Sequence, residues 1–121
     1  MSKVKVFHLS HCTTCKKILD NLQTDVCEVH DIKENRITAK DLDAMAKITG
    51  SYESLFSRKA LLYQKLGLKD KNLTEEDYRN FILMDYTFLK RPVVWKGKQL
   101  FAGHTKDAIL GMKTLIGSKK S

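Results

Sequence analysis

The chain has 121 residues, enough for one domain and too few for a second core of ordinary size. Hydrophobic residues make up 42% of it and no apolar run approaches the ~20 residues of a membrane span, which excludes disordered, collagen-like, disulfide-scaffold and membrane proteins. Lysine and arginine number 22 against 14 acidic residues, and this net charge of +8 favours an anionic partner such as nucleic acid, an oxyanion or an acidic protein.

The N-terminal third predicts a strand, a helix and a second strand. Residues 3–9 form a β-branched run, and residues 26–32 alternate between apolar and polar side chains. Between them, apolar residues at helical spacing predict a helix that begins near Thr13; they are Cys15, Ile18, Leu19 and Leu22. A strand–helix–strand unit of ~30 residues normally gives two parallel strands joined by a right-handed crossover.

The middle of the chain predicts three helices, and the last third returns to strands. In two of the helices a threonine with an aspartate three residues later gives a capping-box pattern. The three helices are expected from Thr38 to Gly50, over about 54–66 with Gly67 as the stop, and from Thr74 with Asp77 toward Asp85. Residues 92–95 and 99–101 then flank Gly97, a glycine suited to a tight hairpin.

A final helix from about Thr105 is expected to end at Gly117 and to bury one apolar stripe, made of Ala108, Ile109, Met112, Leu115 and Ile116. The element order is therefore β-α-β, three helices and β-β-α, an α/β fold. We expect one domain over 1–117 and a frayed basic tail at 118–121.

The cysteines point to redox or nucleophilic chemistry. Three cysteines without a signal-peptide stretch predict a reducing, cytoplasmic location, where cysteines more often react than cross-link. Cys12 and Cys15 form a C-x-x-C motif where the first strand meets the first helix. At a helix N-terminus, unpaired N–H groups and the dipole lower a thiol pKa. Cys12 is thus the predicted nucleophile, with Lys16 adding positive charge, and Cys15 the predicted resolving thiol.

Two other interpretations of the cysteines stay open. Cys15 can be a small core residue with Cys12 an incidental thiol. Alternatively, His8, His11, Cys12 and Cys15 resemble a zinc-binding string, although no second pair of ligands follows by spacing. We expect no metal. Cys27 lies within a predicted strand and is expected to be a core residue.

Pro92 precedes the third strand, the position that proline tolerates best in a sheet. In a thioredoxin-like fold this is the place of a cis-proline loop that faces the C-x-x-C motif. We therefore expect a thioredoxin-like fold with a mixed four-stranded sheet and a cis bond between Arg91 and Pro92.

The sequence resembles the ArsC/Spx group of the thioredoxin superfamily over about 3–116. The resemblance rests on four segments: CTTCKK at 12–17, LFSR at 55–58, LKRPVV at 89–94 and FAGH at 101–104. It implies that Cys12 is a nucleophile and that Arg58 and Arg91 hold an oxyanion, a role suited to the planar guanidinium. Three helices between the second and third strands are also typical of the group.

Two departures separate the chain from the arsenate reductases that use glutathione and glutaredoxin. Those enzymes have a third arginine where Leu100 to Gly103 has none, and they generally lack a cysteine at the position of Cys15. The C-x-x-C form is similar to the Spx branch, redox-sensing regulators that bind the α subunit of RNA polymerase. Gly50 matches in spacing a glycine used for that contact, although a helix-ending glycine is the commoner explanation.

Three functions compete. The first is a cytoplasmic ArsC-like thiol oxidoreductase acting on a small oxyanion or a glutathione-type thiol. It would bind no cofactor, and its electron donor would be glutathione with glutaredoxin, or thioredoxin. The second is an Spx-like regulator that binds the polymerase α subunit. The third, direct nucleic-acid binding, ranks last because the basic residues are spread along the chain rather than clustered with aromatics. No membrane partner is expected.

Overall fold

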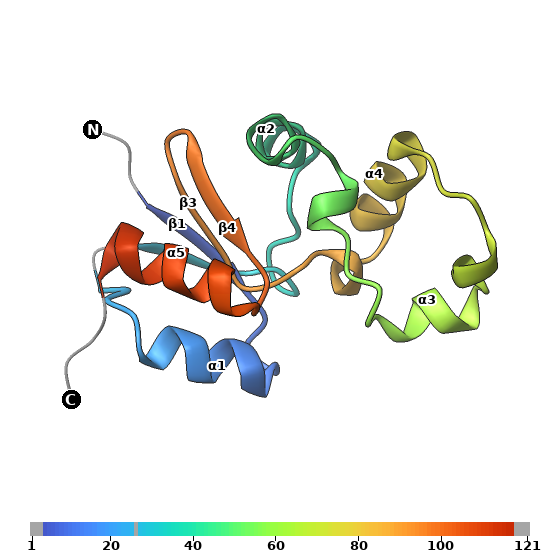
Figure 1. Ribbon diagram of the computed structural model, residues 1–121. Coiled ribbons are helices and arrows are strands. Elements are labelled where there is room, and N and C mark those ends of the chain that lie inside the picture. Colours follow the sequence, from blue (N-terminus) through green and yellow to red (C-terminus); the bar gives the residue numbers. More distant parts are fainter. Residues whose placement is uncertain (1–3, 26, 118–121) are drawn as a thin grey trace. The chain divides into compact units, whose positions relative to one another are not determined.

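The computed structural model describes residues 4–25 and 27–117, which form two compact units (Figure 1). The sheet unit comprises the described residues up to Asn35 and those from Arg91 onward, and the helical unit comprises Arg36–Lys90. The predicted tail at 118–121 lies outside the described residues. The assignment of the whole chain to a single domain stays a prediction.

The sheet unit contains a mixed four-stranded sheet, as predicted. Its strands are β1 (Lys5–His8), β2 (Glu28–Asp31), β3 (Val93–Lys96) and β4 (Gln99–Ala102), in the spatial order β2-β1-β3-β4. β1 is parallel to β2 and antiparallel to β3, and β3 is antiparallel to β4. Gly97 has the positive φ of 59° expected for the β3–β4 turn. The β-α-β and β-β-α ends of a thioredoxin-like fold are thus confirmed.

Two helices pack on one face of this sheet, α1 (Thr13–Asp20) and α5 (Lys106–Ile116) (Figure 1). One buried cluster joins them to the strands, and it consists of Val4, Val6, Ile18, Leu22, Val94 and Met112. In the predicted stripe of the last helix, Met112 is fully buried, whereas Ala108, Ile109, Leu115 and Ile116 are only partly buried against the cluster. The reason is that α5 packs against the sheet with one face, and the opposite face of this helix is in solvent.

The helical unit is built from α2 (Ala39–Thr49), α3 (Leu61–Lys65) and α4 (Glu75–Met84), with short 3₁₀ turns η1 (Glu53–Leu55), η2 (Leu68–Asp70) and η3 (Tyr86–Phe88). Both predicted threonine caps are present. Thr38 Oγ1 accepts from the N–H of Asp41, while Thr74 and Asp77 form the complete reciprocal capping box. Gly50 ends α2 with a φ of 97°, which favours glycine.

The prediction of one helix over 54–66 is wrong. The segment breaks after η1, and α3 starts only at Leu61. The cause is tertiary pairing, because Phe56 forms a bridge with Leu89 and the N–H of Ser57 donates to the Phe88 carbonyl at 2.7 Å. The fully buried Phe56 ring also stacks on Phe88 with centroids 5.1 Å apart. Burial of this aromatic pair outweighs the local helical pattern.

Candidate active site

Cys12 is the N-cap of α1, as predicted. Its backbone is extended (φ −89°, ψ 109°), and its Sγ accepts a hydrogen bond from the N–H of Cys15 at 3.4 Å. The N–H of Cys12 in turn donates to the Leu9 carbonyl at 2.9 Å, which closes the turn between β1 and the helix. Strand, turn and cap therefore place this sulfur at the positive end of the helix dipole.

The surroundings of Cys12 favour its thiolate. Partial burial acts to raise the pKa of the thiol, but hydrogen bonds from the N–H and the thiol of Cys15, the charge of Arg91 and the N–H of Thr14 together hold it below the ordinary value. Each of these groups stabilises negative charge on sulfur. The net effect is a thiol that ionises more readily than a free cysteine.

Cys15 has the opposite character. Its side chain is fully buried on the inner face of α1. Burial, the hydrogen bond that its thiol donates to Cys12 and the negative charge of that neighbour raise its pKa to about 12. Of the two thiols, the more accessible Cys12 therefore ionises first, while Cys15 keeps its proton.

Arg91 and Pro92 form the third part of the site. Their peptide bond is cis, which confirms the prediction. The Pro92 carbonyl accepts from the N–H of Gly103 at 2.9 Å, which ties the start of β3 to the segment after β4. Arg91 is close enough for its charge to lower the pKa of both cysteines. The sheet unit thus brings Cys12, Cys15 and Arg91 together.

Two further residues of the sheet unit, Lys16 and Cys27, differ in their exposure to solvent. Lys16 is exposed in the first turn of α1, and its backbone N–H donates to the Cys12 carbonyl at 3.1 Å. Cys27 is partly buried against the core cluster, and its thiol donates to the Gln23 carbonyl at 3.7 Å. Burial and the charge of Asp25 raise the pKa of Cys27, which makes it the less reactive of the two partly accessible thiols.

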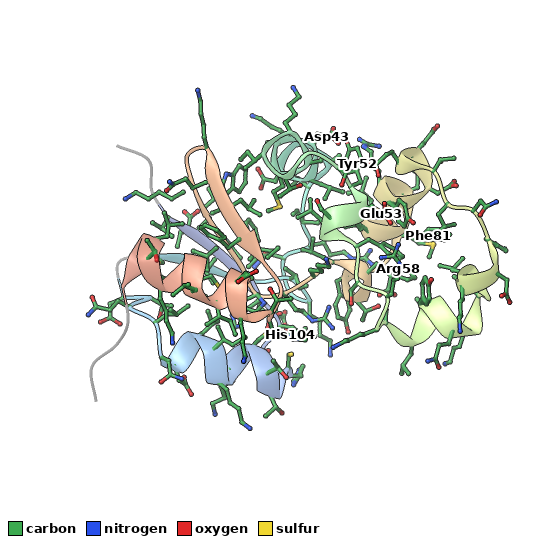
Figure 2. The ribbon with its side chains drawn as sticks, viewed as in Figure 1. Asp43, Tyr52, Glu53, Arg58, Phe81 and His104 are labelled. Atoms are coloured by element: carbon green, nitrogen blue, oxygen red, sulfur yellow. The ribbon has the colours of Figure 1, made fainter. Side chains whose placement is uncertain are left out.

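Arg58 belongs to the helical unit, where its side chain interacts with Glu53, Tyr78 and Tyr63. Its Nη2 donates to Glu53 Oε2 at 2.6 Å and to the Tyr78 hydroxyl at 3.2 Å. Figure 2 labels Arg58 and Glu53. The guanidinium also lies over the Tyr78 ring, 5.8 Å from the centroid. The hydrogen bond to Glu53 outweighs the effect of partial burial and raises the pKa of Arg58.

Sequence reasoning missed Glu53 and Tyr78. A separation of five residues does not place Glu53 beside Arg58 on one helix. The pair forms because the chain between them is not helical, and Tyr78 comes from α4, 20 residues further on. The only sequence signal is that an arginine with a neighbouring acid is often paired.

The helical unit also carries an open surface pocket of about 450 Å³ beside Gly50. Its lining comes from α2, the turn after it and the start of α4, and consists of Asp43, Ala46, Lys47, Gly50, Ser51, Tyr52 and Glu75. Both carboxylates are already hydrogen-bonded, Asp43 to Tyr52 and Arg79, and Glu75 to the N–H groups of Tyr52 and Glu53. These hydrogen bonds therefore hold the two acidic side chains of the pocket wall in place.

The zinc alternative finds no support in the geometry. Within residues 4–25 and 27–117, no three histidine, cysteine, aspartate or glutamate side chains are placed to hold a metal ion, and this includes the string from His8 to Cys15. Across the same part of the chain, no helix has the length and apolar character to span a membrane.

Comparisons with known proteins identify the family and support the fold. A model of the ArsC family matches residues 7–112. Global transcriptional regulator Spx 1 of Lactococcus lactis is 28% identical over 101 residues, which cover 81% of this chain and 79% of the regulator. The Streptococcus mutans regulator Spx is 25% identical, with 88% and 80% covered. Among solved structures, an arsenate reductase from Vibrio cholerae has a TM-score of 0.75 at 19% identity, covering 92% of this chain and 98% of that one, and this likeness supports the fold.

Proposed function

The chain belongs to the ArsC family, and on that basis we propose that it is a cytoplasmic thiol oxidoreductase with Cys12 as nucleophile and Cys15 as resolving thiol. One observation carries the proposal. Within a single helical turn, the pKa of Cys12 is lowered while that of Cys15 is raised to about 12. A thiolate beside a protonated thiol is the state from which a dithiol begins thiol–disulfide exchange.

The first step is attack by the Cys12 thiolate on one sulfur of a substrate disulfide. A bond forms between Cys12 Sγ and that sulfur, the substrate S–S bond breaks, and the departing thiolate takes a proton from water. The Cys15 N–H that caps the thiolate at 3.4 Å fixes the position of the attacking atom. Cys12 is only partly buried, so a substrate can reach it, whereas Cys15 is fully buried.

The second step is resolution by Cys15. Once Cys12 is in a mixed disulfide, its negative charge is gone, and so are the hydrogen bond and the repulsion through which that charge raises the pKa of Cys15. Cys15 then loses its proton more readily and attacks Cys12 Sγ, which expels the second substrate thiolate. The result is a Cys12–Cys15 disulfide and two electrons transferred to the substrate.

The cations favour a small oxyanion or a glutathione-type thiol in its disulfide form as the substrate class. Arg91 is the arginine whose charge acts on Cys12, next to the cis bond to Pro92. Lys16 adds charge in the first turn of α1. We propose Arg58 as a further anion-binding residue, on the strength of the family resemblance. Glutathione with glutaredoxin, or thioredoxin, would then reduce the Cys12–Cys15 disulfide again.

Arsenate is expected to be a slow substrate. Its reduction develops charge on oxygens that arginines must stabilise, and the segment from Leu100 to Gly103 has no arginine. A small disulfide needs no such stabilisation and should be turned over faster.

The test is a turnover assay with arsenate and with a small disulfide, each with glutathione plus glutaredoxin and with thioredoxin. Disulfide reduction should exceed arsenate reduction, and Cys12→Ser should abolish both. Cys27→Ser is the matched control because Cys27 is the other partly accessible thiol, and it should leave turnover unchanged. Activity that survives Cys12→Ser, or no activity with any substrate in the wild type, would refute the proposal.

A second candidate function is an Spx-like, redox-sensing regulator that binds the α subunit of RNA polymerase. It is supported by relatives named as Spx regulators and by the pocket beside Gly50. A pull-down with the α subunit tests it. Gly50→Arg should weaken capture, and Gly67→Arg is the matched control, since both glycines have positive φ and open space around them. Absence of capture in reduced and oxidised protein would exclude this function.

A further inference from the structure

Arg58, Glu53 and Tyr78 form a hydrogen-bonded cluster within the helical unit. Besides the two bonds from Arg58, the Tyr78 hydroxyl lies 3.5 Å from the same Glu53 oxygen. The guanidinium lies over the Tyr78 ring, with its Cζ 5.8 Å from the ring centroid. A carboxylate oxygen thus already occupies a donor at Nη2 that a bidentate anion would use.

The carboxylate of Glu53 is held there by its backbone. The N–H of Glu53 donates to Glu75 Oε2 at 3.2 Å, and its carbonyl accepts from the N–H of Phe56 at 3.0 Å. Phe56 is itself fully buried. With both sides of the residue fixed, Glu53 presents its side chain to Arg58 at little cost in chain entropy.

The ion pair is nevertheless open to exchange. The side chains of Arg58 and Glu53 are 48% and 52% exposed, so water and dissolved ions reach both. Exposed ion pairs of this kind contribute little net stability. A stronger anion from solution can therefore replace the glutamate.

We propose that Glu53 is a specificity-determining residue for anions at Arg58. Glu53 and Tyr78 occupy Nη2, and a ligand that binds the guanidinium as a bidentate fork needs this nitrogen and must displace the Glu53 carboxylate. The inference rests on the anion-binding role given to Arg58 in the proposed function. It selects tetrahedral dianions such as phosphate, sulfate or arsenate, whose greater charge and paired oxygens suit the guanidinium fork. A monoanionic carboxylate offers no more than the glutamate already supplies, and it binds weakly.

The experiment is a calorimetric titration of the full chain with inorganic phosphate at constant ionic strength, in a Cys12→Ser background that removes the thiol chemistry. Glu53→Gln should bind phosphate about two- to fivefold more tightly, the range that corresponds to the loss of an exposed competing ion pair. Glu76→Gln is the matched control, because it removes the same charge from an exposed residue of the same unit. It should leave the affinity unchanged.

Arg58→Lys, combined with Glu53→Gln, keeps the positive charge at residue 58 but removes the paired donors of the guanidinium. It should cancel the gain in phosphate affinity that Glu53→Gln gives. Circular dichroism checks that each variant is folded. Equal tightening by Glu76→Gln, or no difference between Glu53→Gln and its parent, would overturn the inference. Failure here leaves the turnover assay of Cys12 untouched, and loss of turnover leaves this titration valid, so the two proposals fail separately.

Discussion

The two units use their arginines in different ways. In the sheet unit, the charge of Arg91 acts on a thiol that solvent can reach. In the helical unit, Arg58 is bonded to Glu53, and Arg79 donates to both oxygens of Asp43 at 2.8 and 3.3 Å. Positive charge serves reactivity where it faces an ionisable sulfur. In the helical unit, by contrast, both Arg58 and Arg79 are paired with a carboxylate.

Removal of Cys15 should have the largest effect on the reactive side of this comparison. Under mild oxidation the wild type should form a Cys12–Cys15 disulfide, because residues one turn apart at a helix start bring their sulfurs together. Mass spectrometry should show a loss of about 2 Da, which accompanies S–S formation from two thiols. Cys15→Ser should lose this species completely and Cys27→Ser should keep it. Chiefly dimeric or glutathione-linked Cys12 in the wild type would show that Cys15 serves packing alone.

Phe56→Ala should break the helical unit's core. The ring is fully buried and contacts the rings of Tyr63, Tyr78, Phe81 and Phe88. A buried phenylalanine truncated to alanine typically costs ~3–5 kcal/mol of unfolding free energy. Urea unfolding measures this loss. Phe101→Ala, at a partly buried position of the sheet unit, is the comparison and should cost less; an equal or greater cost would place the larger core elsewhere.

Replacement of Arg91 should make Cys12 less acidic. Arg91→Gln removes the positive charge that lowers the pKa of the thiol but leaves the hydrogen bonds from Cys15 in place, so part of the effect remains. Alkylation of Cys12 near neutral pH should become slower and recover as the pH rises. Lys90→Gln, the neighbouring change of the same charge, should have a smaller effect. Identical alkylation profiles for wild type and Arg91→Gln would contradict this role of the arginine.

Asp43 provides the smallest expected effect, on the acid stability of the helical unit. Hydrogen bonds from Arg79 and Tyr52 lower the pKa of Asp43 to about 2 in the folded chain, from an ordinary value of 3.8. Because the folded pKa is the lower one, the stabilisation is present above pH ~3.8 and is lost as the pH falls toward 2. Asp43→Asn should be less stable than the wild type near neutrality and depend less on pH in this window. Urea unfolding at several pH values measures both, and parallel pH profiles would contradict it.

Most of the fold and half of the site were accessible from local sequence signals. The C-x-x-C motif, Pro92, the threonine caps and the hairpin glycine each act over a few residues, and the structure confirms these positions. The break between η1 and α3 was not accessible, since Phe56 is drawn out of a helical pattern by Leu89 and Phe88, more than 30 residues away. For the same reason, the partner of Arg58 was not evident from sequence.

The central claim, that Cys12 carries the thiolate and Cys15 the proton, is tested most directly by titration of the two thiols separately. Carbon NMR of cysteines labelled at Cβ reports each ionisation even where a thiol is buried, and Cys27→Ser removes the third signal. Cys12 should titrate below an ordinary cysteine, and Cys15 should stay protonated until about pH 12, in line with its raised pKa. Ionisation of Cys15 before Cys12 would contradict the claim.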